Sequence, residues 1–207
     1  MLKRFATAES GAAMVEMTIV MTLLLALTLG FVDFGYAFYQ WNAANKAVQV
    51  GARLASISDP VAKGLLTAAP TATPGAPVTA GAYGPFVCTS AGGVSCPSYD
   101  STNFSRIFRG DTAVTANDAC PPPTGTQRPG MCHFFPALKR ENVVITYAAT
   151  GLGFQTRLSG PVPTITVSLQ NVNFRFFFLS GLMGFTDIAM PSMLSTVTGE
   201  DLKSTAP

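Results

Sequence analysis

The chain has 207 residues, 13 basic and 11 acidic side chains, and a formal net charge of +2. No basic patch interleaved with aromatic residues follows the first predicted helix, so nucleic acid is not an expected partner. A hydrophobic content of 48% over this length fits one membrane helix and one further domain of modest size. A second full domain would lack a core of its own.

A basic leader precedes a long apolar run. Residues 1–11 carry Lys3 and Arg4, and residues 12–32 carry a single charge. At about 1.5 Å per residue, the run spans the roughly 30 Å hydrocarbon core of a bilayer. Lys and Arg stay on the cytoplasmic side of a first helix, so everything after Asp33 should lie outside. We therefore expect a single-pass membrane protein with a cytoplasmic N-terminus and an extracytoplasmic C-terminal domain.

The single charge in the apolar run is Glu16, and an acid there needs a partner. A carboxylate at a bilayer centre costs about 2.5–3.5 kcal/mol, and less near the interface. If a peptidase cuts between Gly11 and Ala12, the new α-amino group is mostly cationic at neutral pH and pairs with Glu16 of a neighbouring helix. A cleavable signal peptide fits less well, because its apolar core would have about 7–15 residues. A plain uncleaved anchor remains an alternative.

The N-terminal pattern resembles type IV prepilins, in which a basic leader ends in Gly and the mature chain has Glu at its fifth position. Gly11, Ala12 and Glu16 match that pattern. The next stretch, FVDFGYAFYQWNAANKAVQVGARLAS, is similar to the TadE-like family of minor pilins in tight-adherence (Tad) pilus systems. Phe-Gly at 34–35 and Gly-Ala-Arg at 51–53 carry this likeness.

The C-terminal part adds to the resemblance. A predicted strand at 164–169 is followed by an aromatic, Leu/Gly-rich segment, a second short strand and an acid near Glu200. Residues 59–140 show no such likeness. Asp33 departs from the family pattern, because Glu is expected there, but the charge is kept.

The resemblance implies a minor pilin or pseudopilin that acts in assembly or anchoring of a Tad (Flp-type) pilus and in surface adhesion. It implies a single-pass protein of the bacterial inner membrane with a periplasmic C-terminal domain, which can be incorporated into an extracellular pilus. It also implies leader removal after Gly11 by a prepilin peptidase, with Glu16 setting the helix register. The implied partners are the lipid bilayer, other pilins, Tad secretion components and the peptidase. An alternative is an uncleaved, membrane-anchored periplasmic module that binds a ligand through residues 88–132.

The membrane helix is expected to continue to residue 58 as an amphipathic extension. Proline disfavours a helical conformation in the residue before it, so the helix should stop before Asp59-Pro60. Residues 59–85 are rich in Pro, Ala, Thr and Gly and are predicted to be a linker. One face of the extension is apolar and another polar at 3.6-residue spacing. The apolar set is Trp41, Ala44, Val48, Ala52 and Ala55, and the polar set is Asn42, Lys46, Gln49 and Arg53.

Residues 86–207 are predicted to form a periplasmic domain that holds all four cysteines: Cys88, Cys96, Cys120 and Cys132. An oxidising compartment favours two disulfides. Four cysteines permit three connectivities, and sequence order favours Cys88 with Cys96 and Cys120 with Cys132. A zinc site is the less favoured interpretation, because there is no Cys-x-x-Cys pair and His133 is the only histidine.

Three segments alternate apolar and polar residues and are predicted to be strands: 143–147, 154–158 and 165–169. Short connections favour an antiparallel meander with one polar face, and the long helix is expected to cover the other face. The predicted fold class is therefore α+β: a long N-terminal transmembrane helix that continues into an antiparallel sheet domain with disulfide-stapled loops.

The segment 174–185 (FRFFFLSGLMGF) is apolar but too short to span a bilayer. Core packing is the favoured interpretation, and contact with the bilayer surface or with a neighbouring subunit is the other. No catalytic motif, phosphate-binding loop or calcium loop is present, and one histidine offers little for a triad. We therefore predict no enzymatic activity, no catalytic residue, no cofactor and no metal site.

Overall fold

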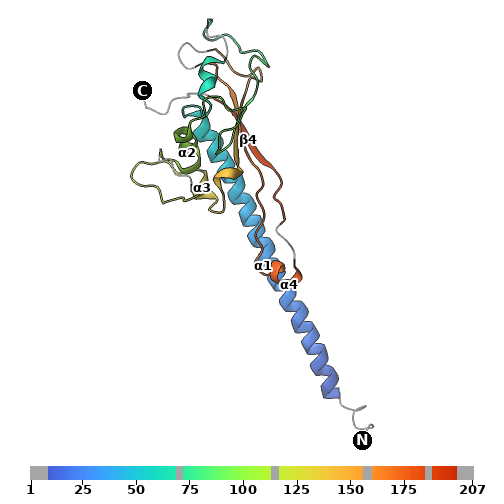
Figure 1. The fold of residues 1–207 in the computed structure, drawn as a ribbon. Helices are drawn as coiled ribbons and strands as arrows, with labels where there is room; N and C mark the ends of the chain where they lie inside the picture. Colours follow the sequence, from blue (N-terminus) through green and yellow to red (C-terminus); the bar gives the residue numbers. More distant parts are fainter. Residues whose placement is uncertain (1–8, 69–71, 113–116, 156–159, 185–187, 200–207) are drawn as a thin grey trace. The chain divides into compact units, whose positions relative to one another are not determined.

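The computed structural model describes residues 9–68, 72–112, 117–155, 160–184 and 188–199. The chain divides into two compact units. The first combines residues up to Gln40 with 173–188, and the second combines 41–172 with the C-terminal residues from Ala189. One helix, α1 (Glu9–Ser56), supplies residues to both units (Figure 1).

The first part of α1 is apolar on all sides and exposed. Within the described residues, α1 is the one helix that is long and apolar enough to cross a membrane. No residue in its most apolar 18-residue stretch is buried. Its threonine hydroxyls do not stay unsatisfied, since Thr18, Thr22 and Thr28 each donate to a carbonyl one turn earlier in the same helix. A polar side chain satisfied in this way is compatible with lipid. These features indicate a single-pass membrane anchor.

The last part of α1 is amphipathic, as predicted. Ala44, Val48, Ala52 and Ala55 are buried, whereas the four polar residues of the opposite face are exposed. Gly51 lies on the buried side, where a Cβ atom would come within 2.5 Å of the Met131 sulfur. The helix ends at Ser56, before Asp59-Pro60.

The sheet of the second unit has four antiparallel strands in the order β1-β2-β3-β4. They are β1 (Phe86–Cys88), β2 (Val143–Ala148), β3 (Thr164–Leu169) and β4 (Met193–Thr198). In the central pair, Tyr147 lies opposite Ile165 and Ile145 opposite Val167, and all four are fully buried. Their side chains form one core with the buried face of α1, so the predicted α+β fold with an antiparallel sheet is confirmed.

Short helical segments complete the fold, and the last of them, at residues 179–183, belongs to the first unit. They are α2 (Ser101–Arg109), α3 (Met131–Phe134) and α4 (Leu179–Met183), with 3₁₀ turns η2 (Lys63–Thr67) and η3 (Arg140–Asn142). Asp100 caps α2, because its Oδ1 accepts from the N–H groups of Thr102 (2.8 Å) and Asn103 (3.1 Å). Gly110 ends this helix at a φ of 82°, and a side chain there would collide with the Arg128 carbonyl.

The predicted strand at 154–158 differs from the structure over its described residues. Phe154 and Gln155 form only isolated bridges, to Pro77 and Pro161, and residues 156–158 lie outside the described residues. Around the first bridge, the Val78 N–H donates to the Gly153 carbonyl and the Gln155 N–H donates to the Ala76 carbonyl. Alternation alone did not reveal those partners.

Residues 59–85 contribute side chains to the core of the second unit. Val61, Leu65, Val78 and Tyr83 are buried there. Val61 is tied to the sheet, because its N–H donates to the Tyr147 hydroxyl at 3.0 Å. The predicted division of the chain at residues 58 and 85 stays a prediction.

Two disulfides staple loops of the second unit, Cys88 with Cys96 and Cys120 with Cys132. Their Cα atoms lie 5.0 and 5.9 Å apart. The first fixes the end of β1, and the second joins a loop to α3. The structure thus has the local pairing that sequence order favours.

Candidate functional site

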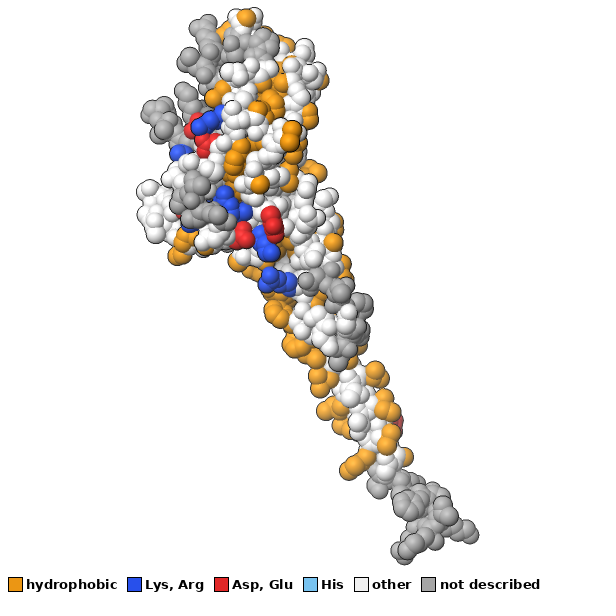
Figure 2. Space-filling view, viewed as in Figure 1, with side chains coloured by type: hydrophobic (Ala, Val, Ile, Leu, Met, Phe, Trp, Pro, Cys, Tyr) orange, Lys and Arg blue, Asp and Glu red, His pale blue; other side chains and the backbone are white. Residues whose placement is uncertain are grey.

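The predicted processing residues lie at the start of the exposed part of α1. Gly11, Ala12 and Glu16 all belong to the helix and are exposed, and the leader residues 1–8 lie outside the described residues. Along this part, Figure 2 shows hydrophobic side chains on both sides of the helix. Leu23, for example, is 66% exposed. Residues this apolar require either lipid or other helices around them.

Asp33 ends this apolar stretch, and its carboxylate is fully buried. It accepts three backbone N–H groups at the start of α4: Phe177 at 2.9 Å, Phe178 at 2.9 Å and Leu179 at 2.6 Å. Hydrogen bonds to the charged form of a carboxylate stabilise that form, and charge-assisted bonds are about twice as strong as neutral ones. Asp33 therefore fixes the segment 173–184 to the helix through backbone N–H groups.

Gln40, two turns later on the same side of α1, makes a second attachment. Its Nε2 donates to the Arg175 carbonyl at 2.9 Å, and its Oε1 accepts from the Arg175 N–H at 3.0 Å. The side-chain amide thus pairs with a peptide group as a neighbouring strand would. We call Asp33 and Gln40, with their backbone partners, the α1 clasp.

Aromatic side chains surround the α1 clasp. Tyr36 contacts Phe177 with ring centroids 4.8 Å apart, and Tyr36 also stacks with Tyr39 at 6.2 Å. The outer members stay exposed: Phe34 by 74%, Tyr39 by 62%, Phe177 by 63% and Phe178 by 41%. We call these four exposed residues the aromatic patch. The segment was favoured as core, and the structure instead leaves much of its aromatic surface uncovered.

The α1 clasp was not predicted from the sequence. Asp33 was noted only as a departure from a family pattern, and Gln40 was not singled out. A signal was present, because a lone acid and an amide seven residues apart share one helix face among aromatic residues. Their partners are backbone groups more than 130 residues away, and these have no sequence signature.

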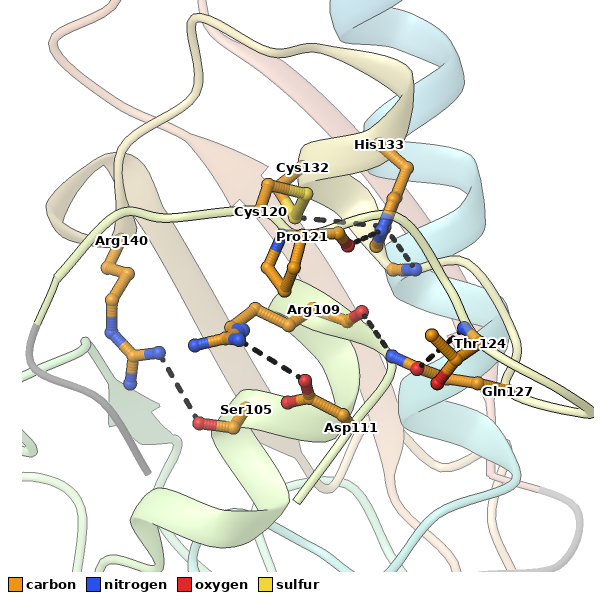
Figure 3. A network of polar contacts seen from close by, with 11 residues as sticks. Ser105, Arg109, Asp111, Cys120, Pro121, Thr124, Gln127, Cys132, His133 and Arg140 are labelled. Atoms are coloured by element: carbon orange, nitrogen blue, oxygen red, sulfur yellow. Dashed lines mark hydrogen bonds and ion pairs between the residues drawn. A yellow bond between two sulfur atoms is a disulfide. The ribbon is translucent and has the colours of Figure 1, made fainter. Parts of the chain in front are cut away.

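The second unit holds a buried arginine cluster (Figure 3). The Arg140 guanidinium lies over the rings of Phe104 and Phe108, 5.0 and 5.6 Å from their centroids, and donates to Ser105 Oγ at 3.3 Å. Arg109 pairs with Asp111 at 3.3 Å. Aromatic faces and neutral acceptors can hold a guanidinium in a core. These contacts join α2 to η3, and they are structural in character.

His133 supports the second disulfide. The Gly130 N–H donates to its Nδ1 at 3.1 Å, so Nε2 carries the proton and donates to the Pro121 carbonyl at 2.9 Å. His133, Cys120 and Cys132 come together as three potential metal ligands. Because the two sulfurs are bonded to each other, neither is the thiolate that zinc requires.

Comparison with known families agrees with the resemblance seen in the sequence. Residues 11–53 match the family described as TadE-like protein. The matched range begins at Gly11, includes Glu16 and Asp33, and lies entirely within α1. No curated protein and no solved structure matches the chain. The match covers about a fifth of the chain, and it shows that α1 is similar to this family.

Proposed function

We propose that this protein is a minor pilin or pseudopilin of a Tad (Flp-type) system, acting in pilus assembly or anchoring and in surface adhesion. The main observation in support is that the residues matching the TadE-like family form a helix whose first part is apolar and exposed. A helix of this kind is stable in a bilayer before assembly and against other apolar helices afterwards. Its partners are therefore lipid, other pilins and Tad secretion components.

In this proposal a prepilin peptidase removes residues 1–11 on the cytoplasmic side. The new α-amino group of Ala12 is then a cation within one turn of Glu16. Glu16 is exposed on the helix, which leaves its carboxylate accessible to the α-amino group of a neighbouring subunit. An ion pair in an apolar bundle is strong enough to set the register between helices, because the unpaired charges would be costly there.

The first test is the N-terminal residue of the protein purified from membranes of the native host. A start at Ala12 supports prepilin processing, whereas an intact Met1 favours the uncleaved binding module. Gly11→Leu should abolish the mobility shift that the loss of eleven residues causes. Gly35→Leu is the matched control, because Gly35 lies in the same helix with no atom near its Cβ position. A shift that persists in Gly11→Leu would refute the proposal.

Glu16→Gln separates processing from assembly. This variant keeps the side-chain shape but loses the charge, so cleavage should continue while co-purification with partner pilins falls. Glu16→Asp, which restores a carboxylate, should recover part of the association. Normal pilus assembly by Glu16→Gln would contradict the register role.

A further inference from the structure

The aromatic patch lies immediately beyond the apolar run, at the depth where a bilayer gives way to water. If residues 12–32 fill the hydrocarbon core, Phe34 and Tyr39 lie about 3 and 10 Å beyond Val32 along the helix. The headgroup layer on that side is about 5–8 Å thick. Side chains on a helix tilt toward its N-terminus, which brings both rings back toward the membrane.

Few charged residues lie near the aromatic patch, and their positions are compatible with contact between the patch and lipid. Between Met17 and Gln40 the only charged residue is Asp33, and between Asn173 and Gly184 the only one is Arg175. Asp33 is fully buried against three N–H groups, so its charge does not face the surroundings. Arg175 is exposed, and an arginine at this depth extends its guanidinium to lipid phosphates.

The aromatic patch extends around α1 instead of marking one side. Phe34 and Tyr39 are five residues apart, which turns them by about 140° about the helix axis. Phe177 and Phe178 are exposed on the segment held by the α1 clasp, which covers a further side. A single partner helix would cover one side only. A bilayer contacts all sides at one depth, as aromatic belts of membrane proteins do.

We propose that the aromatic patch, held by the α1 clasp, is a membrane-interface belt that binds the headgroup layer of the outer leaflet while the protein is stored in the membrane. The segment 173–184 thereby fixes how deeply α1 sits in the bilayer. This inference rests on the membrane insertion in the proposed function, but not on leader cleavage or on pilus assembly.

The test uses the full chain in vesicles of phosphatidylcholine and phosphatidylglycerol. Trp41 is the only tryptophan, and Trp41→Phe gives a background for Phe34→Trp and Phe178→Trp. Leu24→Trp, at a position 56% exposed within the apolar run, is the control for deep lipid, and Val94→Trp, at a fully exposed position, is the control for water. Quenching is measured with iodide and with lipids brominated either near the headgroup or near the chain end.

Phe34→Trp and Phe178→Trp should lose most fluorescence with bromine near the headgroup and little with iodide. Leu24→Trp should respond most to bromine near the chain end. If both patch variants respond to iodide as Val94→Trp does, the proposed membrane-interface belt is refuted, but the membrane insertion of α1 is not. If neither quencher reaches them, protein covers the patch and the belt is likewise wrong. If Leu24→Trp also behaves as Val94→Trp does, α1 is not inserted, and the proposed function loses its membrane step as well.

Discussion

The two units use one helix in two ways. In the first unit, α1 carries no charge from Met17 to Val32, and most of its side chains there are exposed. In the second, the same helix alternates buried alanine and valine with exposed polar residues and joins a packed core. A helix apolar all round matches an apolar solvent, and an amphipathic one matches a boundary between core and water. The change in pattern beyond Asp33 therefore marks a change of solvent.

Polar groups follow the same division. In the first unit, Asp33 and Gln40 are buried and bond to backbone groups, so these two side chains are withdrawn from the surroundings. In the second unit, Asp100 pairs with the half-exposed Lys63 ammonium at 2.5 Å. An ion pair at an aqueous surface contributes little to stability, whereas an unsatisfied group near lipid is costly. The first unit therefore depends more strongly on each of its polar contacts.

The largest expected difference between the units concerns loss of side-chain volume. Ile165→Ala removes a fully buried side chain between Tyr147 and Val197, and it should lower the free energy of unfolding by about 2–5 kcal/mol. Leu27→Ala, at a site 59% exposed, should leave that free energy unchanged. Urea unfolding in detergent micelles measures both variants. Equal effects would contradict the division into two units.

The α1 clasp gives an effect of intermediate size. Asp33→Ala leaves three N–H groups without their acceptor, and it should lower the opening free energy of residues 177–179 by about 1–3 kcal/mol. Amide hydrogen exchange at these residues reports the change directly. Gln40→Ala, which loses two neutral bonds at Arg175, should have a smaller effect. Unchanged protection in Asp33→Ala would show that the aromatic contacts alone hold the segment.

Substitutions of Asp100 should have the smallest effect on stability, and that effect should depend on pH. Burial raises the pKa of Asp100, but the Lys63 ammonium and the N–H groups of Asn103 and Thr102 outweigh it, and the pKa lies below its ordinary value. Asp100→Ala should cost about 1 kcal/mol through loss of the helix cap. Asp100→Asn keeps the cap and loses only the ion pair, so it should cost a few tenths.

The direction of the pH dependence follows from the lowered pKa. A group whose pKa is lowered in the folded state stabilises that state above its ordinary pKa and loses this contribution as the pH falls through the folded-state pKa. The stability difference between the wild type and Asp100→Asn should thus be constant near neutral pH and disappear below the ordinary range of aspartate. Melting temperatures measured across that range test it. A difference that grows on acidification would exclude the ion pair as its source.

Much of the fold was predictable because side-chain periodicity reports burial. The amphipathic end of α1 and the central strands show a regular period in the sequence, and the apolar run is recognised by its length. The short edge strand Phe86–Cys88 was not predicted, because three residues give too few repeats to define a period. The alternation at 154–158 predicted a strand, and its described residues Phe154 and Gln155 form only isolated bridges.

The candidate site was predictable only where side chains carry the signal. Gly11 stands out in the sequence because it separates the basic leader from the apolar run, and Glu16 because it is the only charged residue in that run. Their roles stay predictions. The α1 clasp depends on backbone N–H groups, which every residue except proline possesses. Its specificity comes from the path of the chain, which only the fold reveals.

The long separation in the α1 clasp bears on the order of biogenesis. Asp33 bonds residues 144 to 146 positions later in the chain. The helix leaves the ribosome first, so it enters the membrane long before Phe177 has been synthesised. The α1 clasp can therefore form only after the segment from residue 173 has been synthesised.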